Sequence, residues 1–422
     1  MNFTKKTLQN GLTIISAPMK DSLSVTVLVM VHAGSKYEIK EINGLSHFLE
    51  HMCFKGTVKR PTSFSISREL DSIGSQHNAF TSQEFTGYYA KAHPDHAEKI
   101  LDVVSDIYLN PVFDEKEIEK EKGVIIEEIN MYEDMPHMSV HDVFMRALYG
   151  DQPAGWGVAG EKEVVSRMTR SDFIEYRNKH YVASATTVIV SGNFDESNLL
   201  PKIEKSFEQI STEKKTDKKP ITESQSAPIV EIKKKETDQT HIVIGLRAYD
   251  AKNKKNTALK LLNSILGAGM SSRLFQKLRE EMGVGYYVRS GVDEYTDHGV
   301  LTVSTGVDVN RVPEVVSAVL SELLRFTKEI VSPEELNKAK EYIVGNMYLG
   351  LESSDSIAEY YAIQDILSDE ILTPAKLVEK IRNVTSADIM EVAQEIVRND
   401  RLAIAIVGNI KNESELREMF HF

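Results

Sequence analysis

The chain repeats one order of strand-like and helix-like segments on either side of a polar stretch near its middle. That stretch, residues 211–227, has almost no apolar side chains and is typical of a linker. The last predicted strand of each half is also alike, since residues 186–193 end in Ser-Gly-Asn and residues 402–409 end in Val-Gly-Asn. An internal duplication is the simplest explanation. The sequence therefore predicts two homologous domains, residues 1–210 and 228–422.

Periodic patterns of apolar residues place the elements of each half. In the first half, strands are expected at 11–16, 24–31, 74–81, 85–92 and 186–193, and helices at 44–55, 63–73, 94–109, 114–133 and 171–179. In the second half, strands are expected at 229–233, 241–246, 286–292, 299–305 and 402–409, and helices at 257–266, 267–282, 312–328 and 332–347. Each half therefore mixes strands and helices.

One helix of the first half carries a metal-binding pattern. His47 and His51 are four residues apart, so both imidazoles project from the same side of the helix. Glu50 directly precedes the second histidine, which makes the order H-x-x-E-H, the inverse of the commoner H-E-x-x-H zinc helix. Asn43 is expected to cap the start of this helix and Gly56 to end it. The alternative interpretation is a surface helix with two half-exposed histidines.

A second helix, expected at 114–133, supplies a candidate third ligand. One stripe of this helix carries Ile118, Glu121, Ile125, Glu128 and Tyr132. Two carboxylates on a core-facing stripe are costly unless they are paired or bind a metal. Glu128 is the expected ligand, with Glu121 supporting the site from behind it. Glu127 points about 100° away and is the next candidate. A surface-facing run of charges from 115 to 128 explains the same residues about equally well.

Two histidines, one glutamate and an open fourth position are typical of a catalytic zinc site. One Zn²⁺ per chain is expected, held by His47, His51 and Glu128. Such a metal activates water and polarises a carbonyl, while Glu50 takes the proton from the water. The sequence therefore predicts hydrolysis of peptide bonds. At a similar offset the second half carries Leu261, Ser264 and Ile265, so the metal site is expected in the first half only.

On these residues the chain resembles the M16 metallopeptidases, the inverzincins that include pitrilysin, insulin-degrading enzyme and the subunits of mitochondrial processing peptidase. The resemblance spans nearly the whole chain and is carried by Gly-Leu-Ser-His-Phe-Leu-Glu-His at 44–51, by Glu-Glu-Ile at 127–129 and by the duplication. It implies the LuxS/MPP-like metallohydrolase fold, an α+β fold of two homologous αβ domains, each a mostly antiparallel sheet packed with helices. The family's spacing also places the distal zinc ligand on Glu128 and the outer glutamate on Glu121.

The resemblance implies further site residues. Asn78 and Ala79 match the edge strand that binds substrate backbone by β-addition. Arg279 and Tyr286 have the spacing of an Arg/Tyr pair that holds the substrate and stabilises the oxyanion. From the residues alone, that pair is a surface arginine and an aromatic residue at a strand start. Because both sets lie on one chain, the protein resembles the homodimeric bacterial (M16B-type) peptidases, whose two-domain chains form a clamshell chamber around the substrate.

Composition excludes other classes of protein. A net charge of -13 argues against nucleic acid as a partner. A single cysteine, Cys53, excludes a disulfide framework and suits a reducing compartment. No apolar run reaches the length of a membrane span and no targeting segment is evident, so a cytoplasmic protein without membrane contact is expected.

The predicted activity is that of a zinc metalloendopeptidase acting on unfolded peptides or oligopeptides. Two alternatives are a non-catalytic assembly subunit of the same ancestry and a chaperone-like peptide-binding protein that holds zinc. The set His47, Glu50, His51 and Glu128 argues against the first alternative, because a scaffold has no chemical use for all four.

Overall fold

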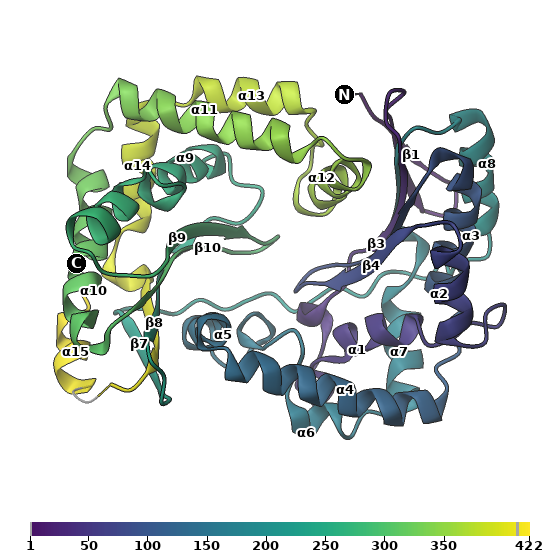
Figure 1. Ribbon diagram of the computed structural model, residues 1–422, viewed down its shortest axis with the longest axis horizontal. Coiled ribbons are helices and arrows are strands. Elements are labelled where there is room, and N and C mark those ends of the chain that lie inside the picture. Colours follow the sequence, from purple (N-terminus) through teal and green to yellow (C-terminus); the bar gives the residue numbers. More distant parts are fainter. Residues whose placement is uncertain (1, 411–412) are drawn as a thin grey trace. The chain divides into compact units, whose positions relative to one another are not determined.

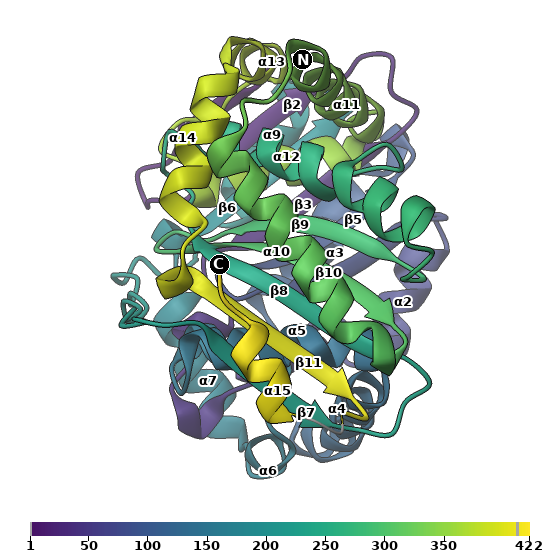
Figure 2. The same cartoon turned by 90° about the vertical axis from the view of Figure 1, so that its left-hand side faces the viewer.

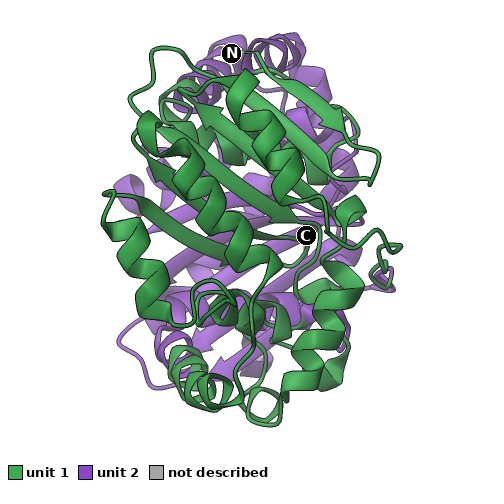
Figure 3. Cartoon of the chain, turned by 90° about the vertical axis from the view of Figure 1, so that its right-hand side faces the viewer, with its two compact units in different colours: residues 1–129, 156–219, 348–373 green, residues 130–155, 220–347, 374–422 purple. Residues whose placement is uncertain are grey.

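The computed structural model describes residues 2–410 and 413–422, which form two compact units (Figure 3). The first unit contains residues 1–129, 156–219 and 348–373, and the second contains residues 130–155, 220–347 and 374–422. The change of unit between residues 219 and 220 falls inside the predicted linker, 211–227. The units nevertheless differ from the division into 1–210 and 228–422, because each includes a segment from the other half of the sequence.

The sheet of the first unit has the strand order β1-β2-β6-β3-β5-β4. Its strands are β1 (Thr4–Thr7), β2 (Thr13–Pro18), β3 (Val25–Val31), β4 (Gln76–Thr81), β5 (Thr86–Ala92) and β6 (Thr186–Gly192). Neighbours are antiparallel except for β2 and β6, which are parallel. β4 therefore lies at one edge of the sheet (Figure 1).

The sheet of the second unit has the order β7-β11-β8-β10-β9. Its strands are β7 (Ile229–Lys234), β8 (Thr240–Ala248), β9 (Val288–Glu294), β10 (Gly299–Val307) and β11 (Leu402–Gly408). Here too one pair is parallel, β7 and β11, and the other pairs are antiparallel. This order repeats β2-β6-β3-β5-β4 strand for strand, as an internal duplication predicts. The predicted α+β fold with mostly antiparallel sheets is confirmed.

Helices pack on both sheets. In the first unit they are α1 (Leu45–Cys53), α2 (Ser63–Asp71), α3 (Ala97–Leu109), most of α4 (Glu115–Asp134), α6 (Lys162–Val165), α7 (Arg170–His180), α8 (Glu196–Ser206) and α12 (Ser354–Leu367). In the second they are α5 (Pro136–Tyr149), α9 (Asn256–Gly267), α10 (Val312–Lys328), most of α11 (Pro333–Gly350), α13 (Pro374–Asn383), α14 (Ser386–Ile396) and α15 (Glu413–Met419). Figure 2 shows α10, α14 and α15 over one face of the second sheet.

The other face of each sheet is covered by a helix that the opposite half of the sequence supplies. Phe144 and Leu148 of α5 belong to an apolar cluster with Val243 of β8 and Ala405 of β11. Ser354 at the start of α12 is fully buried, and its hydroxyl lies 2.8 Å from Thr26 Oγ1 on β3. Neither helix is among those expected from the sequence. α12 buries polar as well as apolar residues and so lacks a clear apolar stripe.

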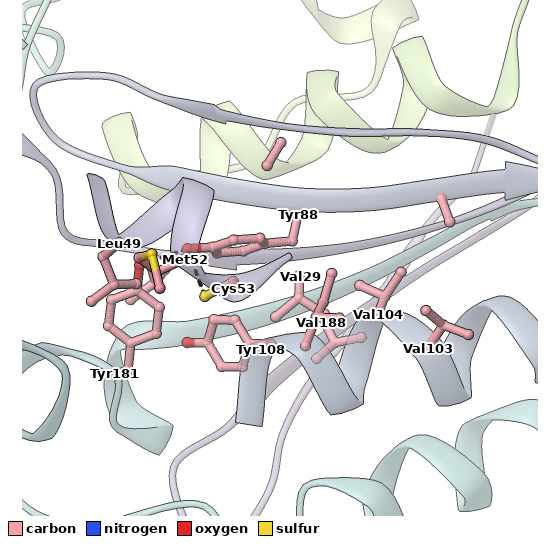
Figure 4. Close-up of a cluster of buried hydrophobic side chains, with 14 of the residues drawn as sticks. Val29, Leu49, Met52, Cys53, Tyr88, Val103, Val104, Tyr108, Tyr181 and Val188 are labelled. Carbon is pink, nitrogen blue, oxygen red and sulfur yellow. Dashed lines mark hydrogen bonds between the residues drawn. The ribbon is translucent and has the colours of Figure 1, made fainter. Parts of the chain in front are cut away.

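The core of the first unit forms between its sheet and several helices, among them α1, which contributes its apolar face. Figure 4 shows Leu49, Met52 and Cys53 of α1 near Tyr88, Tyr108 and Tyr181. Burial raises the pKa of the Cys53 thiol to about 12, so this cysteine fills the core, as expected, and is not an ionised ligand. Among the described residues, no helix combines the length and the apolar composition that crossing a membrane requires.

The buried carboxylate of Asp365 connects α12 to strands β1 and β6 of the first sheet. Its Oδ1 lies 2.5 Å from Lys5 Nζ, and its Oδ2 accepts a 2.6 Å hydrogen bond from Thr187 Oγ1. Burial by itself raises the pKa of Asp365, but hydrogen bonds with His32, Lys5 and Thr187 outweigh it and lower the pKa to about 2. Because the folded pKa lies below the ordinary value, Asp365 stabilises the fold at neutral pH, and this contribution is lost as the pH falls through 2.

Asp365→Asn is therefore expected to lower the free energy of unfolding by about 2 kcal/mol at pH 7. Urea unfolding of both proteins at several pH values measures this difference. The difference should shrink toward pH 2, where wild-type Asp365 also becomes protonated. Asp71→Asn, at an exposed position ending α2, is the control and should change little. A difference that stays constant with pH contradicts the ionic role of Asp365.

Candidate metal centre

The helix that carries the two histidines begins in an unusual way. Its N-cap is Gly44, with φ +99°, and a Cβ there would lie 2.5 Å from Ala159 O, so only glycine fits. The expected cap by Asn43 is wrong. Instead, both carboxylate oxygens of Glu38 accept backbone hydrogen bonds, from Gly44 N (2.8 Å) and Ser46 N (2.6 Å). The Asn43 side chain instead donates from Nδ2 to Glu38 Oε2 (3.0 Å) and to Gly157 O (3.2 Å).

The end of α1 also differs from the prediction. The helix ends at Cys53 and its C-cap is Phe54, whose N–H bonds back to His51 O and Met52 O. Gly56 lies outside the helix. α1 is therefore a nine-residue helix with His47 in its first turn and His51 in its last.

Three side chains from two helices meet beside α1. Glu128 Oε2 on α4 lies 3.7 Å from His47 Nε2 and 3.7 Å from His51 Nε2. The imidazole centroids are 4.7 Å apart. Within the part of the chain that the structure describes, this is the one group of histidine, cysteine and acidic residues whose ligand atoms come within 4.8 Å of one another. No comparable group occurs among the described residues of the second unit.

Glu121 lies behind His51, away from Glu128. Its Oε1 is 3.0 Å from His51 Nδ1 and its Oε2 is 2.6 Å from Lys55 Nζ. Burial alone raises the pKa of Glu121, but the hydrogen bonds with His51 and Lys55 prevail and hold the pKa below its ordinary value. An ionised Glu121 accepts a hydrogen bond from the Nδ1–H group of His51, which leaves the lone pair of Nε2 directed at Glu128.

The donor atoms of this group suit a divalent metal. Burial, with His51 close by, lowers the pKa of His47 to about 4, so its imidazole is neutral at neutral pH and has a lone pair to donate. Two imidazoles and one carboxylate are the protein ligands of many catalytic zinc sites, which keep a fourth position open. The residues that are present therefore fit zinc. Glu127 is exposed on another side of α4 and does not join the group.

Glu50 lies next to this group without belonging to it. Its Oε2 accepts a 2.5 Å hydrogen bond from Thr81 Oγ1, at the end of β4. Burial raises the pKa of Glu50, and the charge of Glu128 adds to this effect, while Thr81 and His51 act in the opposite direction. A carboxylate with a raised pKa is better able to hold a proton during a reaction.

The predicted substrate-binding residues Asn78 and Ala79 lie on β4, the edge strand. The backbone of β4 pairs with β5 on one side only, so its other side is open to a further strand among the described residues. The strand ends at Thr81, the residue that holds Glu50. β4 therefore ends beside Glu50.

Arg279 and Tyr286 belong to the second unit, whereas the histidines and Glu128 belong to the first. The helix predicted at 267–282 contains a π-helical segment, Phe275–Glu281, and Arg279 lies in it with its guanidinium 5.1 Å from the Phe275 ring centroid. Tyr286 is 82% exposed. π-Helical turns are frequent at functional sites, and both side chains are accessible. Their predicted role stays a prediction.

Three residues that support the group are not among those expected from the sequence: Lys55, Thr81 and Glu38. Lys55 lies just past the end of α1, four residues after His51, and that spacing is the available signal for its contact with Glu121. Thr81 reaches Glu50 from a strand end 31 residues away, and Glu38 reaches Gly44 and Ser46 from a loop six and eight residues before them, so neither contact follows a helical period.

Known proteins resemble this chain over nearly its full length. A family model described as Insulinase (Peptidase family M16) matches residues 13–162, and one described as Peptidase M16 inactive domain matches residues 167–343. An uncharacterized zinc protease of Bacillus subtilis, YmxG, is 33% identical over 402 residues, which cover 95% of this chain and 97% of the relative. An uncharacterized zinc protease of Streptomyces coelicolor is 30% identical over 419 residues, covering 98% and 91%.

Solved structures share the fold. A protease from Helicobacter pylori superimposes with a TM-score of 0.90 at 22% identity, covering 96% of this chain and 99% of that one. A peptidase M16 inactive domain from Pseudomonas fluorescens gives a TM-score of 0.89 at 15% identity, covering 97% and 99%.

Proposed function

Because the chain belongs to the M16 (insulinase) family of peptidases, we propose that it is a zinc-dependent endopeptidase that hydrolyses unfolded peptides or oligopeptides. The observation that carries the proposal is the meeting of His47 Nε2, His51 Nε2 and Glu128 Oε2 beside the carboxylate of Glu50. His47, His51 and Glu128 are the proposed ligands of one zinc ion per chain. Glu121 orients His51, and Lys55 keeps Glu121 ionised.

The mechanism assigns Glu50 the role of general base. A zinc ion bound by the three ligands supplies Lewis-acid chemistry, lowering the pKa of water and polarising a carbonyl group. Glu50 accepts a proton from the attacking water and then delivers it to the nitrogen of the leaving amine. The hydrogen bond from Thr81 keeps the Glu50 carboxylate in one orientation between these transfers.

Substrate is proposed to bind as an added strand on β4. Backbone groups of Asn78 and Ala79 would pair with the peptide, which supplies affinity without demanding a particular side chain. This mode selects extended peptides, since a folded protein has few free strand edges to offer. The hydrogen bond from Thr81 to Glu50 supports this proposal, because Thr81 ends the strand that would bind the peptide and also orients the proposed general base.

Arg279 and Tyr286 are proposed to hold the substrate and stabilise the oxyanion. In a homodimer, the pair of one chain would complete the zinc site of its partner, as the resemblance implies. Light scattering on the purified chain tests the homodimer, and a monomer mass at assay concentrations contradicts it. The clamshell chamber and the cytoplasmic location stay predictions.

Metal removal tests the proposed function directly. Purified chain should cleave an internally quenched fluorescent peptide, lose that activity in 1,10-phenanthroline and regain it when Zn²⁺ is added back, because the ligand set holds the ion reversibly. Metal analysis should find one zinc per chain. Cleavage that is insensitive to the chelator contradicts the proposal, and absence of cleavage from a zinc-loaded chain favours the non-catalytic assembly or peptide-binding alternative.

A further inference from the structure

We propose that Glu38 is a positioning residue that holds the first turn of α1, and with it His47, in the geometry that metal binding requires. This inference rests on the proposed role of His47 as a zinc ligand. Glu38 bonds to Asn43, Gly44 and Ser46, and so acts on His47 through the backbone of α1.

The contacts of Glu38 all converge on the residues that precede His47. Its side chain is buried, at 2% exposure. Oε1 accepts from Ser46 N at 2.6 Å, and Oε2 accepts from Gly44 N at 2.8 Å and from Asn43 Nδ2 at 3.0 Å. A carboxylate that takes backbone N–H groups at a helix N-terminus forms charge-assisted bonds and also meets the positive end of the helix dipole.

The position of His47 makes this support necessary. α1 has nine residues, and helices this short are only marginally stable by themselves. His47 lies in the first turn, whose N–H groups have no partners within the helix. At the other end, the contacts of Glu121 with His51 and Lys55 hold the last turn. Glu38 is the matching support for the first turn.

No residue of α1 itself can replace Glu38. A side chain at the N-cap is excluded, because a Cβ on Gly44 would lie 2.5 Å from Ala159 O and 2.9 Å from Gly160 Cα. The cap must therefore come from elsewhere in the chain. Ser46, the usual type of capping residue, already has its hydroxyl 2.7 Å from Tyr176 Oη.

Glu38 is itself held next to the strand that carries Thr81. Ser35 N donates to Ser82 O (3.2 Å) and Lys36 N donates to Gln83 O (2.8 Å). The loop that presents Glu38 is thus bonded to the two residues that follow Thr81. This loop therefore connects the start of α1, which carries His47, to the end of β4, where Thr81 binds Glu50. A shift of Glu38 would move His47 relative to Thr81, the hydrogen-bond partner of the proposed general base.

The test compares Glu38→Gln with Asp388→Asn. Glutamine keeps the shape of Glu38 but offers one acceptor oxygen instead of two, so its amide group faces a backbone N–H. Asp388 is the N3 residue of the capping box of α14 in the second unit, where it accepts from the N–H of the N-cap Thr385 at 2.7 Å, so its variant is a control for a weakened helix cap. Zinc dissociation constants from competition with a chromophoric chelator, together with melting temperatures, are measured at pH 8. Burial raises the pKa of Glu38 to about 7, so wild-type Glu38 is mainly ionised at that pH.

Glu38→Gln is expected to weaken zinc binding about 10- to 100-fold, the range seen when supporting partners of metal ligands are removed. Asp388→Asn should leave the zinc dissociation constant within about twofold while lowering the melting temperature. If Glu38→Gln does not fold, Glu38→Asp takes its place, because it keeps the charge but withdraws the carboxylate by one methylene. An unchanged zinc dissociation constant in the folded variant overturns the inference and leaves Glu38 as an ordinary cap. Wild-type chain that binds zinc but cleaves no peptide overturns the proposed function alone.

Discussion

Replacement of Glu50 by glutamine is expected to lower kcat for peptide cleavage by about 10²–10⁴-fold, the usual contribution of a general base. The glutamine amide can still accept the hydrogen bond from Thr81, but it cannot take a proton from water. Burial and the nearby Glu128 raise the pKa of the Glu50 carboxyl, so the wild-type group is suited to carry that proton. Initial rates with a quenched fluorescent peptide and the zinc content of the same samples provide the measurement.

Zinc content separates the two roles that Glu50 could have. Because Glu50 does not belong to the ligand group, Glu50→Gln should retain a full complement of zinc. Glu41→Gln, at an exposed position nearby in the sequence, removes the same charge and should keep wild-type activity. Equal rates for wild type and Glu50→Gln would refute the general-base role, and loss of zinc with loss of activity would instead make Glu50 part of the metal site.

Replacement of Glu128 by glutamine is expected to weaken zinc binding by more than about 100-fold, because loss of a supporting partner alone costs 10- to 100-fold. Glu128 Oε2 is equidistant, at 3.7 Å, from the Nε2 atoms of both histidines, so its carboxylate completes the triangle of donors. A neutral amide oxygen is a poorer zinc ligand than a carboxylate and leaves the ion less well neutralised. Peptide cleavage should fall in parallel at limiting zinc.

Glu127→Gln is a matched control for this experiment. It makes the same substitution one residue earlier on α4, at an exposed side chain outside the ligand group. Zinc affinity and activity should therefore be unchanged. Full zinc occupancy in Glu128→Gln, with loss in Glu127→Gln, would assign the third ligand to Glu127.

Helical periodicity reveals which side chains share one side of a helix. His47 and His51 were recognised from their spacing, since side chains four residues apart share one side of a helix whatever surrounds it. The stripe on α4 pointed to Glu121 and Glu128 for the same reason, and in the structure Glu121 is 3% exposed while Glu127 faces solvent. The choice between Glu128 and a surface run of charges stayed open from the residues alone, because a stripe does not tell what lies opposite it.

The sequence by itself therefore determined the duplication, the α+β class, most strands and the helix that carries the two histidines. Only the tertiary structure showed that α5 and α12 each pack on the sheet of the opposite half of the sequence. The cap by Glu38 and the hydrogen bond from Thr81 to Glu50 are likewise visible only there. The physical reason is that helix and strand periods depend on neighbours a few residues apart within one element. The contact of Thr81 with Glu50 joins residues 31 positions apart, and Glu38 reaches Gly44 and Ser46 from a loop outside α1, six and eight positions earlier. Neither contact therefore belongs to a repeating pattern.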